Sequence, residues 1–254
     1  MTIMTLSRAI VLAAGQGARL RAASDGRLKP LMPIAGEPLL LRTLRQLHDA
    51  RFRDVTVVLG FQHEIIQEAL TALPFSVRTV LNHNFATDTN IGSLLCGLRD
   101  LDSPALVVEG DVALDDRAVG ALAHAATGPD SVWFTNGSFA PHRLGGCLQT
   151  DEAGRVTDLR YLAANEPRYF DYRKLLGVVY VGPREMPRFL PVLRAAAAQT
   201  LAQYYMIPWC ENLAALPAVA IDLSHCCTGT FNTPEEYEHC QTLFATPRGD
   251  LHVP

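Results

Sequence analysis

The chain has 254 residues, of which 48% are hydrophobic and 19% are charged, and its formal net charge is −4. This length is enough to bury a substantial core, and the composition excludes a disordered chain. The small negative charge gives no reason to expect nucleic acid as a partner. No apolar run is long enough to cross a bilayer, and the first eight residues lack the pattern of a signal peptide. We therefore expect a soluble cytoplasmic protein with no membrane partner.

The first half of the chain alternates between predicted strands and helices. A continuous apolar run at residues 8–14 is typical of a strand buried on both faces. Further strands are predicted at residues 55–60, 77–81 and 105–108, and helices at residues 38–50, 63–73 and 90–101. Strands that alternate with helices predict a parallel sheet with right-handed crossovers.

The alternation loosens after about residue 131. Short strands are predicted at residues 131–135, 146–149, 155–159, 175–181 and 218–223, and helices at residues 184–198, 201–216 and 234–244. No internal repeat or low-complexity linker divides the chain. We therefore expect one α/β domain over residues 1–254, with a Rossmann-like mixed, mainly parallel sheet flanked by helices.

A glycine-containing loop follows the first predicted strand, where residues 12–20 read LAAGQGARL. Small residues let the backbone approach a ligand and offer its N–H groups to phosphate oxygens. Arg19 and Lys29, the latter one of only two lysines, can neutralise a triphosphate and the charge that develops as pyrophosphate leaves. The loop is neither a Walker A loop nor a dinucleotide-binding turn. The alternative interpretation is a tight connection that binds no ligand.

Together with Lys29-Pro30 and PIAGEPLL at residues 33–40, this loop resembles the signature of the sugar-nucleotidyltransferase superfamily. The resemblance covers most of the chain. It implies a nucleotide-diphospho-sugar transferase type of fold and an EC 2.7.7 type of enzyme that uses Mg²⁺, joins a nucleoside triphosphate to a phosphorylated acceptor and releases pyrophosphate. About residues 1–130 would bind nucleotide and about residues 131–254 the acceptor. By position, the nucleotide-binding residues of the loop would be Leu12, Ala13, Ala14, Gly15 and Gly17, with Arg19 and Lys29 as catalytic phosphate ligands.

The sequence VVEGD at residues 107–111 ends a central predicted strand, at the edge where ligands of open α/β sheets bind. A carboxylate there can coordinate Mg²⁺ bridged to phosphates. The family resemblance places a metal-binding Asp here, so Asp111 is predicted as the catalytic metal ligand. Glu109 shares its face of the strand and is predicted to belong to the nucleotide site. The alternative interpretation is that Asp111 caps a turn or a helix.

An Asn-rich loop at residues 82–93 runs into a predicted helix and offers side-chain amides and N–H groups to a base and ribose. Asn82, Asn90 and Ser93 are predicted to bind nucleotide, with helix capping as the alternative for the last two. This segment contains an Asn, a spacer and then Asn-x-x-Ser-Leu. The pattern resembles that of the superfamily branch that uses CTP. Its members include phosphocholine, phosphonate and polyol-phosphate cytidylyltransferases. Glucose-1-phosphate enzymes usually show Gln-Pro-x-Gly-x-Ala here.

Thr-Pro-Glu-Glu at residues 233–236 predicts a helix start. In many relatives the residue before Thr-Pro-Glu is an Asp that serves as second metal ligand, but here it is Asn232. A neutral amide ligates Mg²⁺ more weakly than a carboxylate, so Asn232 is predicted as a metal ligand with either one or two metals bound.

Two clusters are candidates for binding the acceptor. Trp209 and Glu211 follow two tyrosines in a segment that resembles Tyr-Trp-Asp-Asn of phosphocholine cytidylyltransferases, and an aromatic face with an acid suits a quaternary ammonium. The two tyrosines are equally well explained as helix-packing residues. His142, Arg143 and Lys174 instead suit a small acidic acceptor such as a phosphonocarboxylate. The choice between these acceptors stays open.

The six cysteines contain no Cys-x-x-Cys pair, and the His and Cys residues at 225–227 and 239–240 match no standard zinc pattern. We expect free buried thiols and no structural disulfide.

These observations predict a cytidylyltransferase that transfers CMP from CTP to a small phosphorylated or phosphonate acceptor with Mg²⁺, as a monomer or homodimer. Phosphocholine, a phosphonate and a polyol phosphate are the candidate acceptors. One alternative is a sugar-1-phosphate uridylyl- or thymidylyltransferase. The other is a nucleotide-binding regulatory protein that has lost catalysis.

Overall fold

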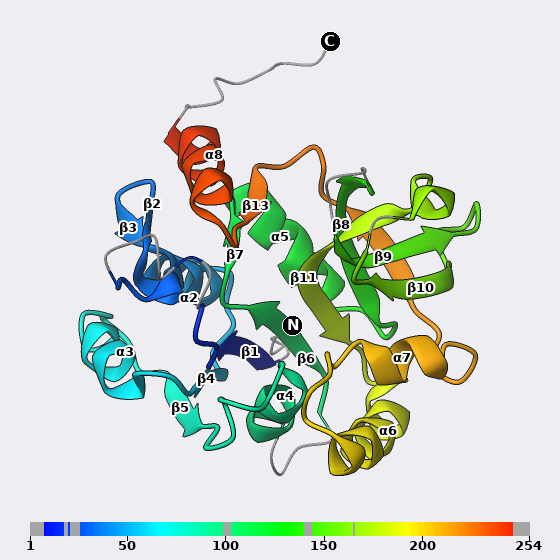
Figure 1. Cartoon of the computed structure of the whole chain (residues 1–254), viewed down its shortest axis with the longest axis horizontal. Helices are drawn as coiled ribbons and strands as arrows, with labels where there is room; N and C mark the ends of the chain where they lie inside the picture. Colours follow the sequence, from blue (N-terminus) through cyan, green and yellow to red (C-terminus); the bar gives the residue numbers. More distant parts are fainter. Residues whose placement is uncertain are drawn as a thin grey trace, which may run out of the picture.

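The structure is a computed structural model, and it describes residues 8–17, 20, 26–98, 103–139, 144–164 and 166–245. A nine-stranded sheet forms its centre (Figure 1). The main path of the sheet runs through β10 (Val156–Leu162), β9 (Gly145–Thr150), β11 (Arg173–Val181), β6 (Ala105–Glu109), β1 (Arg8–Ala13), β4 (Val55–Leu59) and β5 (Arg78–Leu81). Off this path, β8 (Val132–Ser138) pairs with β11 and with β12 (Val219–Asp222).

The first half of the sheet is parallel, as predicted. β1 pairs with β4 on one side and with β6 on the other, and β4 pairs with β5, all in parallel register. Ala9, Ile10 and Val11 of β1 are fully buried because helices cover both faces of the sheet. One face packs against α2 (Leu39–Asp49), α3 (His63–Leu70) and α5 (Asp116–Ala125), and the other against α4 (Ile91–Gly97), α6 (Met186–Gln199) and α7 (Ile207–Glu211).

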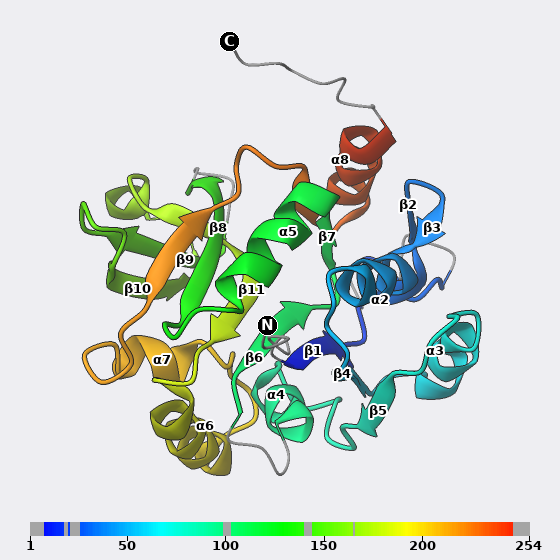
Figure 2. The same ribbon diagram turned by 180° about the vertical axis from the view of Figure 1, so that it is seen from behind.

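Beyond β6 the sheet becomes largely antiparallel. β11 runs antiparallel to β6, β8 and β9, and β9 runs antiparallel to β10, while β12 returns parallel to β8. The rear view shows α5 lying over this half of the sheet (Figure 2). The mixed sheet flanked by helices confirms the predicted fold class.

A small ribbon brings the C-terminal segment to the end of β6. β7 (Val112–Leu114) follows β6 directly and pairs antiparallel with β13 (Thr228–Thr230), which leads to α8 (Pro234–Ala245). The 3-10 helix η1 (Lys29–Leu31) and the hairpin of β2 (Pro33–Ile34) and β3 (Glu37–Pro38) lie on the same side. A third apolar cluster, which includes Ile34, Ala113 and Phe231, joins these pieces.

Two predicted elements differ from the structure. The helix predicted at residues 201–216 is wrong in extent, because α7 covers only Ile207–Glu211. The preceding residues form bends and turns beside the loop before α4, where the carbonyl of Leu201 accepts the N–H of Thr89 and the N–H of Tyr205 donates to Asn90 Oδ1. α5 was not predicted, although Asp115 caps it by accepting the N–H of Ala118 at 2.8 Å.

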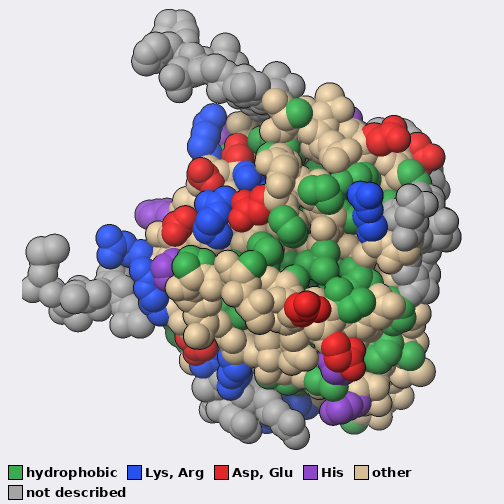
Figure 3. Space-filling model, turned by 90° about the vertical axis from the view of Figure 1, so that its left-hand side faces the viewer, with side chains coloured by type: hydrophobic (Ala, Val, Ile, Leu, Met, Phe, Trp, Pro, Cys, Tyr) green, Lys and Arg blue, Asp and Glu red, His purple; other side chains and the backbone are tan. Residues whose placement is uncertain are grey.

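On the face in Figure 3, most basic side chains lie toward the left-hand side with acidic side chains beside them, while hydrophobic and uncharged atoms fill much of the centre. No helix in the described part of the chain is both long and apolar enough to span a membrane. The cysteines carry free thiols, and those of Cys147, Cys226, Cys227 and Cys240 are buried.

Candidate active site

Two adjoining cavities lie at the C-terminal ends of β1 and β6. The first, of about 310 Å³, lies beside the glycine-containing loop and is called here the loop cavity. Its lining contains these residues of the predicted nucleotide site: Leu12, Ala13, Ala14, Gly15, Gly17, Lys29, Asn90, Ser93, Glu109 and Asp111. The structure therefore brings together residues that are up to 99 positions apart in the sequence, from Leu12 to Asp111.

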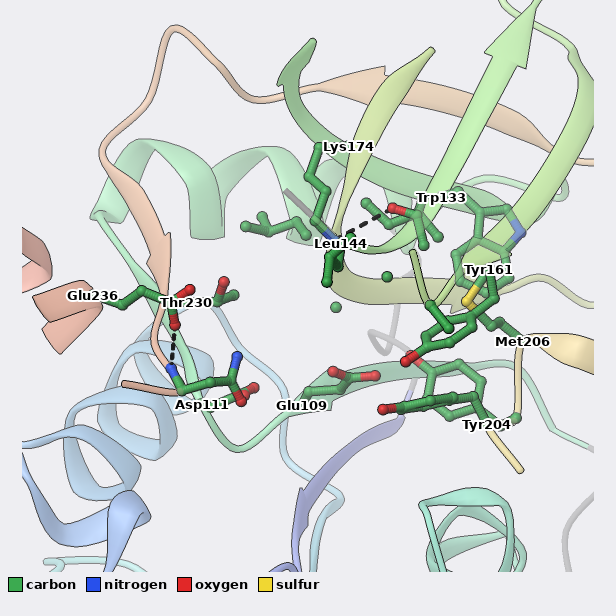
Figure 4. Close-up of a pocket in the computed structure, with 18 residues that line it drawn as sticks. Glu109, Asp111, Trp133, Leu144, Tyr161, Lys174, Tyr204, Met206, Thr230 and Glu236 are labelled. Carbon is green, nitrogen blue, oxygen red and sulfur yellow. Dashed lines mark hydrogen bonds between the residues drawn. The ribbon is translucent and has the colours of Figure 1, made fainter. Parts of the chain in front are cut away.

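The second cavity, of about 470 Å³, opens between β6, β9, β10 and β11 and is called here the aromatic cavity (Figure 4). Its walls include Trp133, Tyr161, Tyr204, Tyr205, Met206 and Lys174. Glu109, Asp111, Tyr204 and Asn232 line both cavities, so these four residues mark the junction between them.

Three polar side chains meet at this junction. Lys29 Nζ lies 2.5 Å from Asp111 Oδ2 and donates to Asn232 Oδ1 at 3.0 Å. Gly110 allows Asp111 to lie this close to the glycine-containing loop, because a Cβ at Gly110 would be only 2.6 Å from the carbonyl oxygen of Leu12. Residues from three distant parts of the sequence thus form one charged cluster.

The start of α8 fixes Asn232. The Glu236 carboxylate accepts the backbone N–H groups of Asn232 and Thr233, at 2.5 and 3.3 Å, and the Thr233 hydroxyl accepts the N–H of Glu236. This reciprocal pattern is a capping box. The Thr-Pro-Glu-Glu sequence that predicted the helix start therefore also positions the amide of Asn232 beside Lys29.

The side-chain oxygens of Asp111 and Asn232 could ligate a small hard cation, because both lie next to one position. The ammonium of Lys29 occupies that position in this structure. Among the described residues, no group of three or more His, Cys, Asp and Glu side chains is arranged to hold a metal ion. One carboxylate and one amide oxygen are a sparse donor set for a protein site. Such a set suits Mg²⁺ when substrate phosphates supply the other ligands.

Glu109 is held at the junction by two donors. Asn90 Nδ2 lies 3.2 Å from its Oε1, and the Tyr205 hydroxyl donates to the same carboxylate. Burial, followed by the charge of Asp111, raises the pKa of Glu109 to about 7, against the opposing effects of Lys174, Tyr205 and Lys29. Burial and the charge of Glu109 in turn raise the pKa of Tyr205 well above its usual value.

The Asn-rich loop contains an internal hydrogen-bond network that the sequence did not reveal. Asp88 accepts the N–H groups of Gly92 and Ser93 and the hydroxyl of Ser93, so it caps α4. Asn82 donates to Asp88 at 2.8 Å and to Ser93 at 3.0 Å, is 2% exposed and lines neither cavity. Its position fits a role in shaping the loop rather than the predicted contact with nucleotide.

Two of the predicted acceptor residues, Trp209 and Glu211, lie away from the cavities, so the structure contradicts these two predictions. Trp209 is fully buried between α6 and β8, and its indole N–H donates to the carbonyl of Leu216 at 2.8 Å. Glu211 is exposed at the end of α7 and lines neither cavity. Lys174 does line the aromatic cavity and donates to the carbonyl of Gly146 at 3.3 Å. Arg19, His142 and Arg143 lie outside the described residues.

Sequence reasoning missed several residues of the aromatic cavity. Tyr161 from β10 stacks on Tyr204 with ring centroids 4.4 Å apart, and Trp133 from β8 also lines the cavity. Gly177 interrupts β11 with φ of 82°. A glycine inside an apolar strand pattern signals a bulge or a close approach, so this residue was detectable. Nothing in the local sequence distinguished Tyr161 from a packing residue.

Comparison with protein families gives a match over most of the chain. Residues 9–204 match the MobA-like NTP transferase domain. A CMP-5'-(3-aminopropyl)phosphonate synthase from Streptomyces rubellomurinus is 35% identical over 120 residues, which are 46% of this chain and 19% of that protein. Bifunctional protein GlmU from Acidithiobacillus ferrooxidans is 31% identical over 156 residues, which are 61% of this chain and 33% of that protein. The matches thus span about a fifth to a third of these curated relatives.

Solved structures show the same fold at low sequence identity. CTP:phosphocholine cytidylyltransferase LicC from Streptococcus pneumoniae has a TM-score of 0.79 at 18% identity, over 94% of this chain and 99% of that chain. The inositol-1-phosphate CTP transferase from T. maritima has a TM-score of 0.72 at 14% identity, over 96% and 98%. With the match over residues 9–204 and the glycine-containing loop beside Lys29, these findings show that the chain belongs to the MobA-like NTP transferase domain family, within the nucleotidyltransferase superfamily.

Proposed function

We propose that the protein is a Mg²⁺-dependent cytidylyltransferase that transfers CMP from CTP to a small phosphate or phosphonate acceptor. The observation that carries this proposal is the cluster of Lys29, Asp111 and Asn232 at the junction of two cavities. A nucleotidyl transfer needs one cavity for the nucleotide and one for the acceptor, with charge-stabilising groups where the two substrates meet.

The loop cavity is the proposed nucleotide site. Its small residues, Ala13, Ala14 and Gly15, leave space for a nucleotide to approach the backbone, and Lys29 supplies positive charge for the phosphates. Arg19 is proposed as a second phosphate ligand. CTP is the proposed nucleotide because the Asn-x-x-Ser-Leu segment forms part of the wall and because a relative is named as a CMP-phosphonate synthase.

The proposed reaction is an in-line displacement at the α-phosphorus of CTP. An oxygen of the acceptor phosphate or phosphonate forms the new P–O bond, and the bond from the α-phosphorus to the bridging oxygen breaks to release pyrophosphate. The attacking oxygen is already anionic at neutral pH, so no general base is needed. Lys29 would neutralise charge on the phosphates, and Asp111 and Asn232 would hold Mg²⁺, which supplies Lewis-acid stabilisation of the same charge.

Single substitutions in the cluster test this role. Lys29→Ala and Asp111→Ala should each lower kcat by at least about a hundredfold, because each removes a charge that stabilises the transition state. Turnover is measured as pyrophosphate release with CTP, Mg²⁺ and 2-aminoethylphosphonate, and ³¹P NMR of the product should show a new P–O–P linkage to cytidine monophosphate. Glu211→Gln, on the exposed end of α7, is the matched control. Near-normal kcat in a folded Lys29 or Asp111 variant would show that the assigned role is wrong.

A sugar-1-phosphate uridylyltransferase is the second candidate. It is favoured by the 31% identity to GlmU and by 29% identity over 128 residues to an N-acetylmuramate alpha-1-phosphate uridylyltransferase from Neisseria meningitidis. The loop cavity would then accept UTP instead of CTP. Pyrophosphate release with UTP and a sugar 1-phosphate, and none with CTP, would establish this candidate.

A further inference from the structure

The Glu109 carboxylate extends from the end of β6 into the junction of the two cavities (Figure 4). Asn90 and Tyr205 each donate one hydrogen bond to it. A carboxylate offers about four acceptor positions, so these two bonds leave Glu109 able to accept hydrogen bonds from a ligand in the cavity. These two contacts therefore fix the position of the Glu109 carboxylate and leave part of its hydrogen-bond-accepting capacity unused.

β11 leaves room for this carboxylate. Gly177 has φ of 82°, and a Cβ built on it would lie 3.0 Å from Glu109 Oε2 and 3.3 Å from its Cδ. A side chain at this position would press on the carboxylate from the β11 side. The glycine therefore lets Glu109 lie against the strand while both residues line the aromatic cavity.

Charges of both signs surround the space where an acceptor would lie. Lys29 and Lys174 are close enough to Glu109 to act on it electrostatically, and Lys174 lines the same cavity. The stacked rings of Tyr161 and Tyr204 form the neighbouring wall. Aromatic faces and a carboxylate both attract cations, whereas the two lysines attract an anion.

We propose that Glu109 determines acceptor specificity by binding a primary ammonium group on the acceptor, while the acceptor's phosphorus group lies near Lys29 and Lys174. This inference rests on the proposed nucleotidyl transfer. The N–H groups of a primary ammonium can donate to the remaining acceptor positions of the carboxylate, which a quaternary ammonium cannot do. A carboxylate on the acceptor tail would be repelled. The acceptor class is therefore the short aminoalkyl phosphonates and phosphates.

A matched pair of acceptors tests the proposal. We expect wild-type kcat/KM with CTP to be at least about tenfold higher for 2-aminoethylphosphonate than for ethylphosphonate, because the analogue without the amine leaves the carboxylate unpaired. Glu109→Gln should abolish this preference mainly through the KM of the amine compound. Glu211→Gln, the acidic residue outside both cavities, should keep it.

The outcomes separate this inference from the proposed function. Three results would overturn the role of Glu109 and leave the proposed nucleotidyl transfer intact. They are equal use of the two acceptors by the wild type, a preference of the wild type for phosphonoacetate or phosphocholine, and an unchanged preference in folded Glu109→Gln. If no acceptor releases pyrophosphate, the proposed function fails. In that case, calorimetry measures the binding of the same two phosphonates to the wild type and to Glu109→Gln. The inference is supported if the wild type binds only the amine compound and Glu109→Gln does not bind it. Any other result overturns the inference.

Discussion

The Lys29 ammonium contacts an oxygen of Asp111 at 2.5 Å and an oxygen of Asn232 at 3.0 Å, and it also lies 5.6 Å from the ring centroid of Phe231. Side chains from two other parts of the sequence therefore surround this positive charge. A divalent cation that used the same two oxygens would have to displace this ammonium. Phosphates on a bound nucleotide would favour the exchange, because they attract Lys29 and supply further metal ligands.

Asn232 gives a prediction about the metal requirement. Asn232→Asp replaces a neutral oxygen donor by a charged one, so the apparent Mg²⁺ concentration for half-maximal activity should fall several-fold. The measurement is a Mg²⁺ titration of pyrophosphate release at saturating substrates. Asn232→Ala is the companion variant and should shift the requirement in the opposite direction. If neither substitution moves the midpoint of the titration, Asn232 is not a metal ligand.

Local sequence patterns selected residues that the structure brings together, and their roles stay predictions. Lys29, Asp111, Asn232 and described residues of the glycine-containing loop each line at least one of the two cavities. Prediction was wrong at Trp209, because a Trp beside an acid has the same local pattern whether it packs in the core or faces a ligand. Its burial depends on α6 and β8, which the sequence does not place next to it.

Among the elements, β11 shapes the aromatic cavity, the proposed acceptor site, because it borders β6, β8 and β9 at once. Its pairing with β8 shifts register between Leu175 and Val179, around Gly177. A register shift at a glycine bends the strand locally and changes the side chains that it presents. Gly177 lines the aromatic cavity from this irregular part of the strand, and Lys174 lines it from a second register shift between Arg173 and Leu175.

Gly177→Ala tests this arrangement. The left-handed backbone at φ of 82° disfavours a Cβ, so the free energy of unfolding should fall by about 1–2 kcal/mol. Pressure on Glu109 should also raise the KM for 2-aminoethylphosphonate. Gly120→Ala in α5 is the control, because a Cβ there meets no atom within 4 Å, and it should slightly stabilise the helix. Denaturant unfolding and steady-state kinetics measure both effects, and a Gly177→Ala protein as stable as wild type would contradict this account.

Helix and strand positions were predictable where apolar periodicity was strong, as in β1, β4 and α2. The segment before α7 was not, because contacts with the loop before α4 override its helical pattern. Tyr205 gives its backbone N–H to Asn90 Oδ1 at 2.8 Å instead of to a helical carbonyl. This contact joins residues 115 positions apart, so the local sequence cannot predict it.

At the scale of the whole molecule, the site lies where a parallel half-sheet meets an antiparallel one. β1 and β6 contribute the loop cavity, and β9, β10 and β11 contribute the aromatic cavity. The β7–β13 ribbon then brings Asn232 to the junction from near the C-terminal end of the described residues. The alternation of strands and helices predicted the first half, but the antiparallel pairings that build the second cavity depend on long-range contacts.

The two cavities are proposed to hold CTP and a phosphonate or phosphate acceptor. The most direct measurement is pyrophosphate release from CTP, UTP, dTTP, ATP and GTP, each with Mg²⁺ and crossed with 2-aminoethylphosphonate, phosphocholine, a polyol phosphate and glucose 1-phosphate. We predict release with CTP and an aminoalkyl phosphonate or phosphate, with little from the other nucleotides. Release only with UTP or dTTP and glucose 1-phosphate, or no release with any pair, would contradict the claim.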